Sequence, residues 1–275
     1  MVNTFYHILE SRKIVVTRSK VALITGGSRG IGAATAIAFA SRDYDVAVTY
    51  RNKVARAAEV VEAIEMCGQR GLSVGGDITK SADVQRLFAT FKEWRNALDV
   101  LVLNASGGLE RDLLAADPDY AMHINRDAQL LLVENALPLM AKGSTIIFVT
   151  SHWAYLYGKT QQIPAYAPIA ASKYAGEQAL RAQQAMLASH GVRLLIVTGD
   201  MIEDSITPRL LERSAPGLIA HRRATSGPLP DSVDMSEAIV NAAEHPSLPS
   251  GHTVVVGGTL ESHLTIPFIH RYNSN

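Results

Sequence analysis

Short runs of β-branched and other apolar residues alternate with alanine-rich helical patterns from residue 20 to about residue 257. Most runs are apolar almost throughout, which is typical of parallel strands that are covered on both faces. Strict alternation of strand and helix predicts an α/β fold with one doubly wound, parallel, seven-stranded sheet and helices on both faces. The expected strands are Val21–Thr25, Asp45–Thr49, Gly71–Val74, Asp99–Leu103, Thr145–Thr150, Val192–Thr198 and Thr253–Val256.

Two segments interrupt this alternation within the single domain that 275 residues allow. Residues 1–19 precede the first strand and are expected to form an N-terminal extension to a domain spanning residues 20–275. Residues 200–233 separate the sixth strand from the next helix and hold four of the 11 prolines. A connection of this length is usually a lid, a binding loop or disordered. Its apolar residues favour a lid that is mobile when empty and ordered over a bulky substrate.

The composition excludes several classes of partner. Lys+Arg and Asp+Glu number 26 each, so no net field attracts nucleic acid or an anionic membrane. The single cysteine, Cys67, cannot form an internal disulfide, which favours a reducing compartment. The chain has no run of about 18 apolar residues and no signal-peptide pattern at its start. We therefore expect a cytoplasmic protein with a small-molecule substrate and no metal site, and leave a homo-oligomer open.

A glycine-rich segment directly after the first expected strand opens the first helix. It reads TGGSRGIG from Thr25 to Gly32. Glycines let the backbone turn tightly and approach a pyrophosphate, while the helix N-terminus supplies unpaired N–H groups and a positive dipole. Because this turn follows the first strand of a βαβ unit, it predicts a Rossmann-type nucleotide site. The expected contacts are Gly26, Ser28, Arg29, Gly30, Ile31 and Gly32.

This segment resembles the TGxxxGxG motif of the short-chain dehydrogenase/reductase family, and the resemblance continues from about Lys20 to Gly258. Other matching segments are Gly76-Asp77-Ile78, Leu103–Gly107 in place of the family's NNAG, Asn125 within HINRDAQLLL, and Val254–Gly258. The NNAG-like segment departs from the family, with Leu for the first Asn and Ser for the Gly. The resemblance implies further cofactor contacts at Asp77, Ile78, Asn104, Ala105 and Ser106.

The residues that follow the second expected strand indicate which dinucleotide binds. A carboxylate there would accept the ribose hydroxyls of the adenosine and repel a 2′-phosphate. This chain has Tyr50 instead, followed by Arg51 and Lys53, with Arg29 nearby in the glycine turn. Arginine presents a planar fork that suits phosphate. The charges favour NADPH over NADH, with Tyr50 and Arg51 as contacts.

The family resemblance also implies a catalytic set of asparagine, serine, tyrosine and lysine. Asn125, Ser151 and Lys173 match three of these positions. Lys173 is implied to grip the nicotinamide ribose as well. The tyrosine should lie four residues before the lysine, one helical turn away. That residue is Ile169, which has no proton to give.

Tyr166, seven residues before Lys173, is the first candidate to replace the missing acid. A Tyr-x6-Lys spacing resembles the enoyl reductase branch of the family. Pro168 is expected to start the helix, which leaves the direction of the Tyr166 side chain unspecified. His152 is a second candidate donor. The sequence favours protonation by a substrate phenol or by water, so we expect the loss of the Tyr166 hydroxyl to reduce the rate only slightly.

The substrate region departs from the family in two places. The interval from Ser151 to Lys173 is longer than usual and adds aromatic residues. After the sixth strand, Gly199-Asp200 replaces a proline-glycine turn, and Asp200 either caps the first turn of the lid or faces the substrate. Ile202 keeps the position from which family members hold the nicotinamide carboxamide through the backbone. The expected substrate contacts are Ser151, His152, Trp153, Tyr157 and Asp200.

These features favour an NADPH-dependent ketoreductase for a bulky, polycyclic aromatic ketone, similar to the reductases that tailor aromatic polyketide antibiotics. A phenol beside the carbonyl would supply the hydrogen bond that the missing tyrosine does not. Two alternatives stay open. One is an enoyl reductase that uses Tyr166, and the other is an inactive NADPH-binding sensor. Retention of Asn125, Ser151 and Lys173 together disfavours the sensor.

Overall fold

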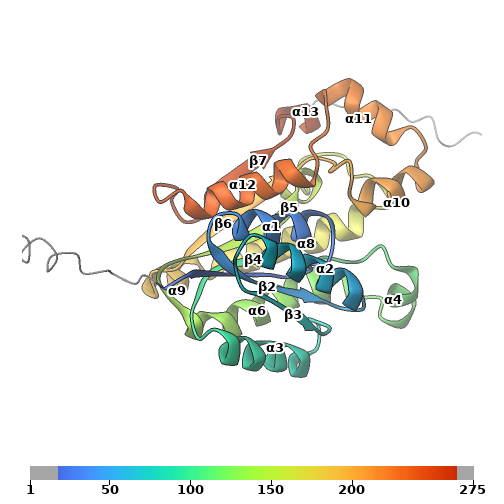
Figure 1. The fold of residues 1–275 in the computed structure, drawn as a ribbon. Coiled ribbons are helices and arrows are strands. Elements are labelled where there is room, and N and C mark those ends of the chain that lie inside the picture. Colours follow the sequence, from blue (N-terminus) through green and yellow to red (C-terminus); the bar gives the residue numbers. More distant parts are fainter. Residues whose placement is uncertain (1–17, 265–275) are drawn as a thin grey trace, which may run out of the picture.

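A computed structural model describes residues 18–264 of the chain. The seven strands form one all-parallel sheet in the order β3-β2-β1-β4-β5-β6-β7 (Figure 1), which confirms the predicted architecture. The strands are β1 (Lys20–Ile24), β2 (Tyr44–Tyr50), β3 (Gly71–Gly75), β4 (Leu98–Leu103), β5 (Met140–Ser151), β6 (Arg193–Gly199) and β7 (Thr253–Val256). Each expected strand lies within one or two residues of its predicted bounds, except β5, which begins earlier.

Helices cover both faces of the sheet, as Figure 1 shows. They are α1 (Gly30–Ala40), α2 (Val54–Met66), α3 (Ser81–Trp94), α4 (Arg111–Ala116), α5 (Tyr120–Met122), the π-helical turn η2 (His123–Asp127), α6 (Ala128–Ala136), the 3₁₀ turn η3 (Leu137–Leu139), α7 (His152–Tyr155), α8 (Ala167–Ala182), α9 (Gln184–Ser189), α10 (Ile206–Ser214), α11 (Leu218–Ser226), α12 (Ser232–Glu244) and α13 (Glu261–Leu264). The start of α8 beside Pro168 agrees with the sequence prediction. None of the helices within residues 18–264 is long and apolar enough to cross a membrane.

Successive residues of the strands enter two different apolar cores. In β1, Val21 and Leu23 belong to the core under α3 and α6, while Ala22 and Ile24 belong to the core under α1 and α12. Neighbouring side chains of a strand point to opposite faces, so a strand that is covered on both sides must be apolar throughout. This double burial explains the continuous apolar runs from which the strands are predicted.

The order of the strands reverses between β1 and β4, which are neighbours in the sheet although β2 and β3 separate them in the sequence. Ligands of open α/β sheets bind at the carboxyl ends of the strands, where such a reversal leaves a crevice. The pairing of β5 with β6 ends at Ser151 opposite Gly199. The residues that follow these two strands therefore meet at the same edge.

The expected lid folds into two helices, α10 and α11. A third apolar core joins the lid to the segments after β5 and at the start of α8. It contains Trp153, Ala154, Ile163, Tyr166, Ile169, Ala170, Met201, Leu211, Leu218 and Leu229. Of the expected N-terminal extension, residues 1–17 lie outside the described residues, and Arg18 forms an ion pair of 2.7 Å with Asp99.

Candidate functional site

The turn between β1 and α1 is packed too tightly for a side chain at Gly27 and at Gly32. A Cβ atom on Gly32 would lie 2.4 Å from the carbonyl oxygen of Gly26. Gly26 and Gly30 have φ of 68° and 53°, in the left-handed region that favours glycine. The helix α1 begins without a side-chain cap and without an acidic residue in its first turn. Its N–H groups and dipole therefore fit the pyrophosphate of a dinucleotide.

Hydrogen bonds fix the glycine turn to the end of β4. The Thr25 hydroxyl lies 3.0 Å from the backbone nitrogens of both Asn104 and Ala105. The Asn104 side chain donates to the Thr25 carbonyl at 2.9 Å. Asn104 thus ties the loop after β4 to the glycine turn. This is a structural role, separate from the expected contact of Asn104 with the cofactor. Of the other expected contacts, Arg29 and Ser106 are exposed beside this crevice, while Ile202 is buried after β6.

Arg51 at the end of β2 is attached to a residue that the sequence did not single out. Its guanidinium donates to the Tyr120 hydroxyl at 2.7 Å and lies 6.0 Å from the centre of the same ring. Tyr120 is buried, which raises the pKa of its hydroxyl to about 12. A Cβ on Gly107 would lie 2.9 Å from this ring. The contact fixes the direction of Arg51, while Lys53 and Arg29 are exposed cations near the same corner.

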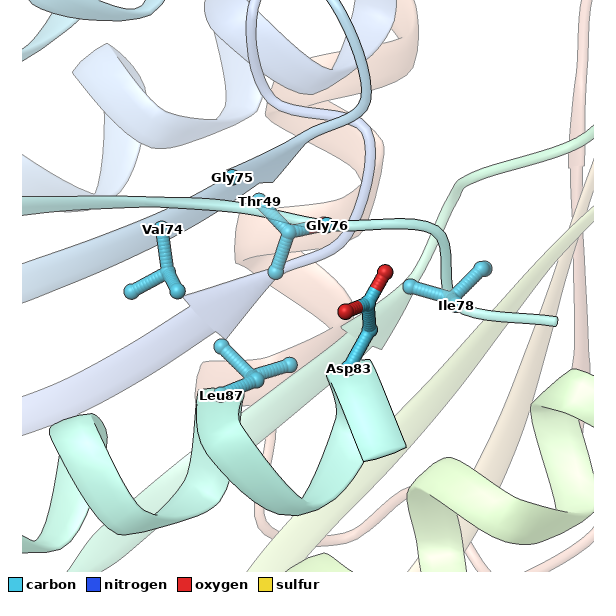
Figure 2. Close-up of a pocket in the computed structure, with 7 residues that line it drawn as sticks. All are labelled: Thr49, Val74, Gly75, Gly76, Ile78, Asp83 and Leu87. Carbon is cyan, nitrogen blue, oxygen red and sulfur yellow. The ribbon is translucent and has the colours of Figure 1, made fainter. Parts of the chain in front are cut away.

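The loop after β3 is held by Asp83, at the start of α3. Its carboxylate accepts a hydrogen bond of 2.8 Å from the backbone nitrogen of Asp77 and an ion pair of 2.6 Å from Arg86. Figure 2 shows this carboxylate pointing toward Gly76 and Ile78, across a cavity of about 10 Å³. Asp77 itself accepts two hydrogen bonds from Thr79. The predicted adenine-contacting pair, Asp77 and Ile78, therefore sits on a fixed loop.

Tyr166 and Ser151 meet at the carboxyl end of β5. The Tyr166 hydroxyl donates to the Ser151 Oγ at 3.0 Å, although Tyr166 stands just before the first turn of α8. Ser151 also caps α7, accepting a bond of 3.3 Å from the Ala154 nitrogen. Burial raises the pKa of the Tyr166 hydroxyl, and the bond to Ser151 partly opposes this shift. The start of α8 beside Pro168 therefore does not turn Tyr166 away from Ser151.

Lys173 and Asn125 occupy buried positions beside this pair. The Lys173 ammonium donates to the Val149 carbonyl at 3.1 Å, and burial lowers its pKa to about 8. The Asn125 amide nitrogen binds the Gly107 carbonyl at 2.9 Å and the Ser172 hydroxyl at 3.0 Å. Its buried Oδ1 has no hydrogen-bond partner within residues 18–264. Asn125 lies in η2, and such π-helical turns are frequent at functional sites.

Ile169 lies four residues before Lys173, where the family resemblance implies a tyrosine. Its side chain is 3% exposed and packs in the apolar core under the lid. A Cβ on Gly108 would lie 3.1 Å from its Cγ1 atom. The chain has thus filled this position with an apolar side chain, while the phenol that reaches Ser151 comes from Tyr166.

His152 does not offer a proton toward the substrate side, contrary to its prediction as a donor and substrate contact. Its Nε2 lies 2.8 Å from the Gly257 carbonyl, and its Nδ1 lies 3.1 Å from the Thr198 hydroxyl. The carbonyl can only accept, so the ring proton sits on Nε2 and both nitrogens are engaged. Burial lowers the pKa of this histidine, which keeps the ring neutral. His152 therefore joins β5 to β6 and to the loop after β7.

Asp200, which is expected either to cap the lid or to face the substrate, has its carboxylate paired inside the protein. It forms a buried ion pair of 2.7 Å with Arg222 of α11. Its Oδ1 also accepts from the backbone nitrogen of Met201 at 2.7 Å. Arg222 has no role in the sequence predictions. The clue in the sequence is Asp200 itself, because a carboxylate directly after a buried strand needs a cationic partner.

Of the remaining expected substrate contacts, Trp153 is buried and Tyr157 is half-buried. The Trp153 ring lies 4.7 Å from the ring of His263 and 5.5 Å from the Arg222 guanidinium. Tyr157 packs on Tyr174 at 5.8 Å between ring centres. The structure therefore places Trp153 in a polar and aromatic cluster with the lid, and Tyr157 against the face of α8.

A comparison with family models assigns this arrangement. The model described as short chain dehydrogenase matches residues 20–213. The chain belongs to this family. Among the curated relatives of this chain, the hydroxynaphthalene reductase-like protein Arp2 of Metarhizium acridum is 36% identical to it over 161 residues. That match covers 58% of this chain and 59% of the relative, so the aligned part spans less than two thirds of Arp2.

Two solved structures show the same fold as this short chain dehydrogenase. One is a short chain dehydrogenase from Burkholderia cenocepacia J2315 in complex with NADP, with 27% identity and a TM-score of 0.75. It covers 88% of this chain and 98% of its own. The other is LugOII, described as a promiscuous reductase that catalyses keto-reduction at C1 during lugdunomycin biosynthesis. It has 27% identity and a TM-score of 0.72, and it covers 86% of this chain and 95% of its own.

Proposed function

We propose that this chain is an NADPH-dependent ketoreductase for a bulky aromatic ketone, with Tyr166 as the proton donor. The observation that carries the proposal is the 3.0 Å hydrogen bond between the Tyr166 hydroxyl and Ser151 at the carboxyl end of β5. Nucleotide binding is supported by the glycine turn and by the NADP complex of the Burkholderia relative. Arg29, Arg51 and Lys53 supply positive charge for a 2′-phosphate.

The bound cofactor supplies the hydride, and the residues of the chain position the carbonyl and manage its charge. Ser151 and Tyr166 together present two hydroxyl groups where charge develops on the carbonyl oxygen. Tyr166 passes its proton to this oxygen, and the Ser151 hydroxyl orients the carbonyl group. Burial raises the pKa of Tyr166, so the phenol is protonated and able to donate at neutral pH. The positive charge of Lys173 then stabilises the phenolate that is left behind.

Two observations support an aromatic substrate. Apolar residues, among them Trp153, Leu211 and Leu218, join the lid to the segment that carries Tyr166, and such side chains would contact a large apolar ring system that enters under the lid. Two similar proteins bear names of aromatic or polyketide-type reactions, a hydroxynaphthalene reductase-like protein and the lugdunomycin reductase. A polycyclic aromatic ketone fits both observations, and a tailoring step in the synthesis of an antibiotic is one setting for it.

Incubation with NADPH and a panel of aryl ketones, quinones and enoyl thioesters tests the proposal. We expect NADPH oxidation with an aryl ketone or quinone, and an alcohol or hydroquinone as the product. Reduction of a C=C bond instead would favour the enoyl reductase that shares the Tyr-x6-Lys spacing. Tight NADPH binding without turnover of any compound would favour the sensor. NADH that binds as tightly as NADPH would contradict the cofactor assignment.

A further inference from the structure

A charged cluster lies between the end of β6, the lid helix α11 and the helix α13. Arg222 binds Asp200 through its Nε and Nη2 atoms, at distances of 2.7–3.1 Å. Its Nη2 also lies 2.8 Å from the Nδ1 of His263. Asp200, Arg222 and His263 are each less than 5% exposed. The network lies outside the Tyr166–Ser151 pair, and the proposed reaction does not use it.

The hydrogen bonds fix the protonation of His263. The guanidinium can only donate, so the Nδ1 of His263 accepts and its proton is carried by Nε2. Burial and the positive charge of Arg222 lower the pKa of His263 to about 4, so the ring is neutral. Asp200 balances Arg222, and the three side chains together carry no net charge.

Two donors of this cluster have no acceptor at hydrogen-bond geometry within residues 18–264, although the Thr259 carbonyl lies near enough to the His263 ring to oppose part of the fall in its pKa. They are the Nη1 of Arg222 and the Nε2 of His263. The nearest carboxylate oxygen to Nε2, on Asp200, is 3.7 Å away, which is too far for a hydrogen bond. Buried donors in folded proteins are almost always paired, so these two indicate an acceptor that comes from outside this network.

Both side chains line one cavity of about 20 Å³. This volume accommodates one oxygen atom or one water molecule. The lining residues are Trp153, Thr160, Gln161, Leu218, His221, Arg222 and His263. Trp153 and Leu218 also belong to the apolar core that contains Tyr166. The cavity therefore adjoins the space that we assign to the aromatic substrate, at the lid end of that core.

We infer that the cavity binds a second, neutral acceptor oxygen of the substrate, such as a carbonyl or ether oxygen remote from the ketone that is reduced. The inference rests on the proposed function for its reacting ketone. Arg222 Nη1 and His263 Nε2 donate to this oxygen, and the Trp153 ring packs against its aromatic carrier. A carboxylate is disfavoured, because Asp200 already neutralises Arg222 and an anion would add an unbalanced buried charge.

Calorimetric binding to the NADP⁺-loaded protein tests the inference without turnover. The ligands are 1-tetralone, its 5-, 6- and 7-methoxy derivatives, and the corresponding carboxylates. We expect one methoxy isomer to bind about tenfold more tightly than 1-tetralone, since a satisfied buried donor is worth about this factor. The matching carboxylate should gain nothing. Equal affinities of all the methoxy isomers and 1-tetralone would overturn the inference and leave a site for water only.

Two variants assign the preference to the cluster. His263→Phe removes the Nε2 donor and keeps a ring, and Asp200→Leu combined with Arg222→Met removes the ion pair without leaving a lone charge. We expect the preference to fall several-fold in the first variant and to vanish in the second. Arg223→Met is the matched control, since Arg223 is exposed on the same helix and pairs with Glu203. A preference that survives both variants would overturn the inference.

The two proposals fail in distinguishable ways. If the wild-type protein binds the methoxy isomer selectively but reduces none of the ketones, the binding inference stands and the proposed reaction is wrong. If it reduces 1-tetralone and binds all the methoxy isomers with the same affinity as 1-tetralone, the proposed reaction stands and the oxygen site is wrong. Absence of binding by every ligand would contradict both.

Discussion

At the scale of single residues, Tyr166 is the side chain on which the proposed reaction depends most. Its hydroxyl contacts Ser151 at 3.0 Å, so Tyr166→Phe should remove a general acid worth about 10²–10⁴ in kcat. The sequence alone predicts a much smaller effect, because Pro168 starts the helix of Lys173 after Tyr166 and leaves the direction of the tyrosine unspecified. Steady-state rates on a reducible aryl ketone measure the loss.

A matched control separates proton transfer from packing. Tyr155→Phe removes a hydroxyl from the same inserted segment, and we expect an unchanged rate. NADPH affinity should stay the same in Tyr166→Phe. A loss of less than threefold in this variant would show that the substrate or water supplies the proton.

Lys173 is predicted to be destabilising in the absence of cofactor. Burial lowers its pKa to about 8 from an ordinary value of 10.5. A pKa lowered this far makes the charged amine cost on the order of 3 kcal/mol at pH 7, before its bond to Val149 offsets part of this cost. Lys173→Met should therefore raise the free energy of unfolding by about 1–3 kcal/mol while it abolishes activity. Urea unfolding at pH 7 measures the gain.

The pH dependence of this gain follows from the sign of the shift. Below pH 8 both the folded and the unfolded chain carry the proton on Lys173, so the penalty is complete. Between pH 8 and 10.5 the unfolded chain binds more protons, and wild-type stability recovers as the pH rises. The advantage of Lys173→Met should fall to about half by pH 9.5. A gain that does not change with pH would assign it to packing instead.

At the scale of elements, one buried ion pair attaches the lid helix α11 to the sheet. Arg222→Met leaves Asp200 charged and unpaired, and we expect it to cost about 3–5 kcal/mol of stability. Adding Asp200→Leu should recover most of this loss, because no lone charge stays buried. Denaturant unfolding of the single and double variants measures both effects, and equal stabilities of the two would contradict the prediction.

The same pair bears on the mobility of the lid, which stays a prediction. Hydrogen exchange of residues 200–230 should slow when cofactor and a bulky substrate bind. In Arg222→Met, the amides of α11 should exchange faster than in the wild-type protein, while those of α1 do not change. Strong protection of residues 200–230 in the empty protein, equal to that of the sheet, would refute a mobile lid.

How far the sequence predicts these elements depends on the range of the interactions that form them. The strands and the turn at Gly26–Gly32 follow from local patterns, since double burial and positive φ restrict which residues can occur. The partners of Tyr166, Asp200 and Arg51 lie 15, 22 and 69 positions away in the chain. No local pattern encodes such contacts. Sequence analysis therefore finds these three residues but misassigns or leaves open what they touch.

At the scale of the whole molecule, cofactor binding should stabilise the entire domain, because the dinucleotide site joins loops from β1, β2, β3 and β4. At a concentration 100 times its Kd, a ligand of the folded state adds about 2.7 kcal/mol. NADPH should therefore raise Tm by on the order of 5–10 °C. NADH at the same concentration should raise it less.

Arg51→Ala should reduce the shift caused by NADPH by roughly 2–4 °C, which corresponds to about 1 kcal/mol for an exposed contact with phosphate. The shift caused by NADH should not change. Arg70→Ala is the control, since Arg70 is exposed just before β3, at the far end of that strand. Thermal unfolding with each cofactor measures all three proteins. Equal responses of Arg51→Ala and Arg70→Ala would exclude Arg51 as a phosphate ligand.

The packing of Ile169 has a consequence for how such a chain can evolve. Ile169 is 3% exposed within the apolar core under the lid, so the larger tyrosine at this position should overpack the core unless a second residue nearby becomes smaller. If Tyr166 is the acid, as we propose, a return to the common spacing therefore requires more than one mutation. Searches that require the common spacing will discard such chains as inactive. Their sequences are better screened for a tyrosine near the start of α8 and a serine at the end of β5.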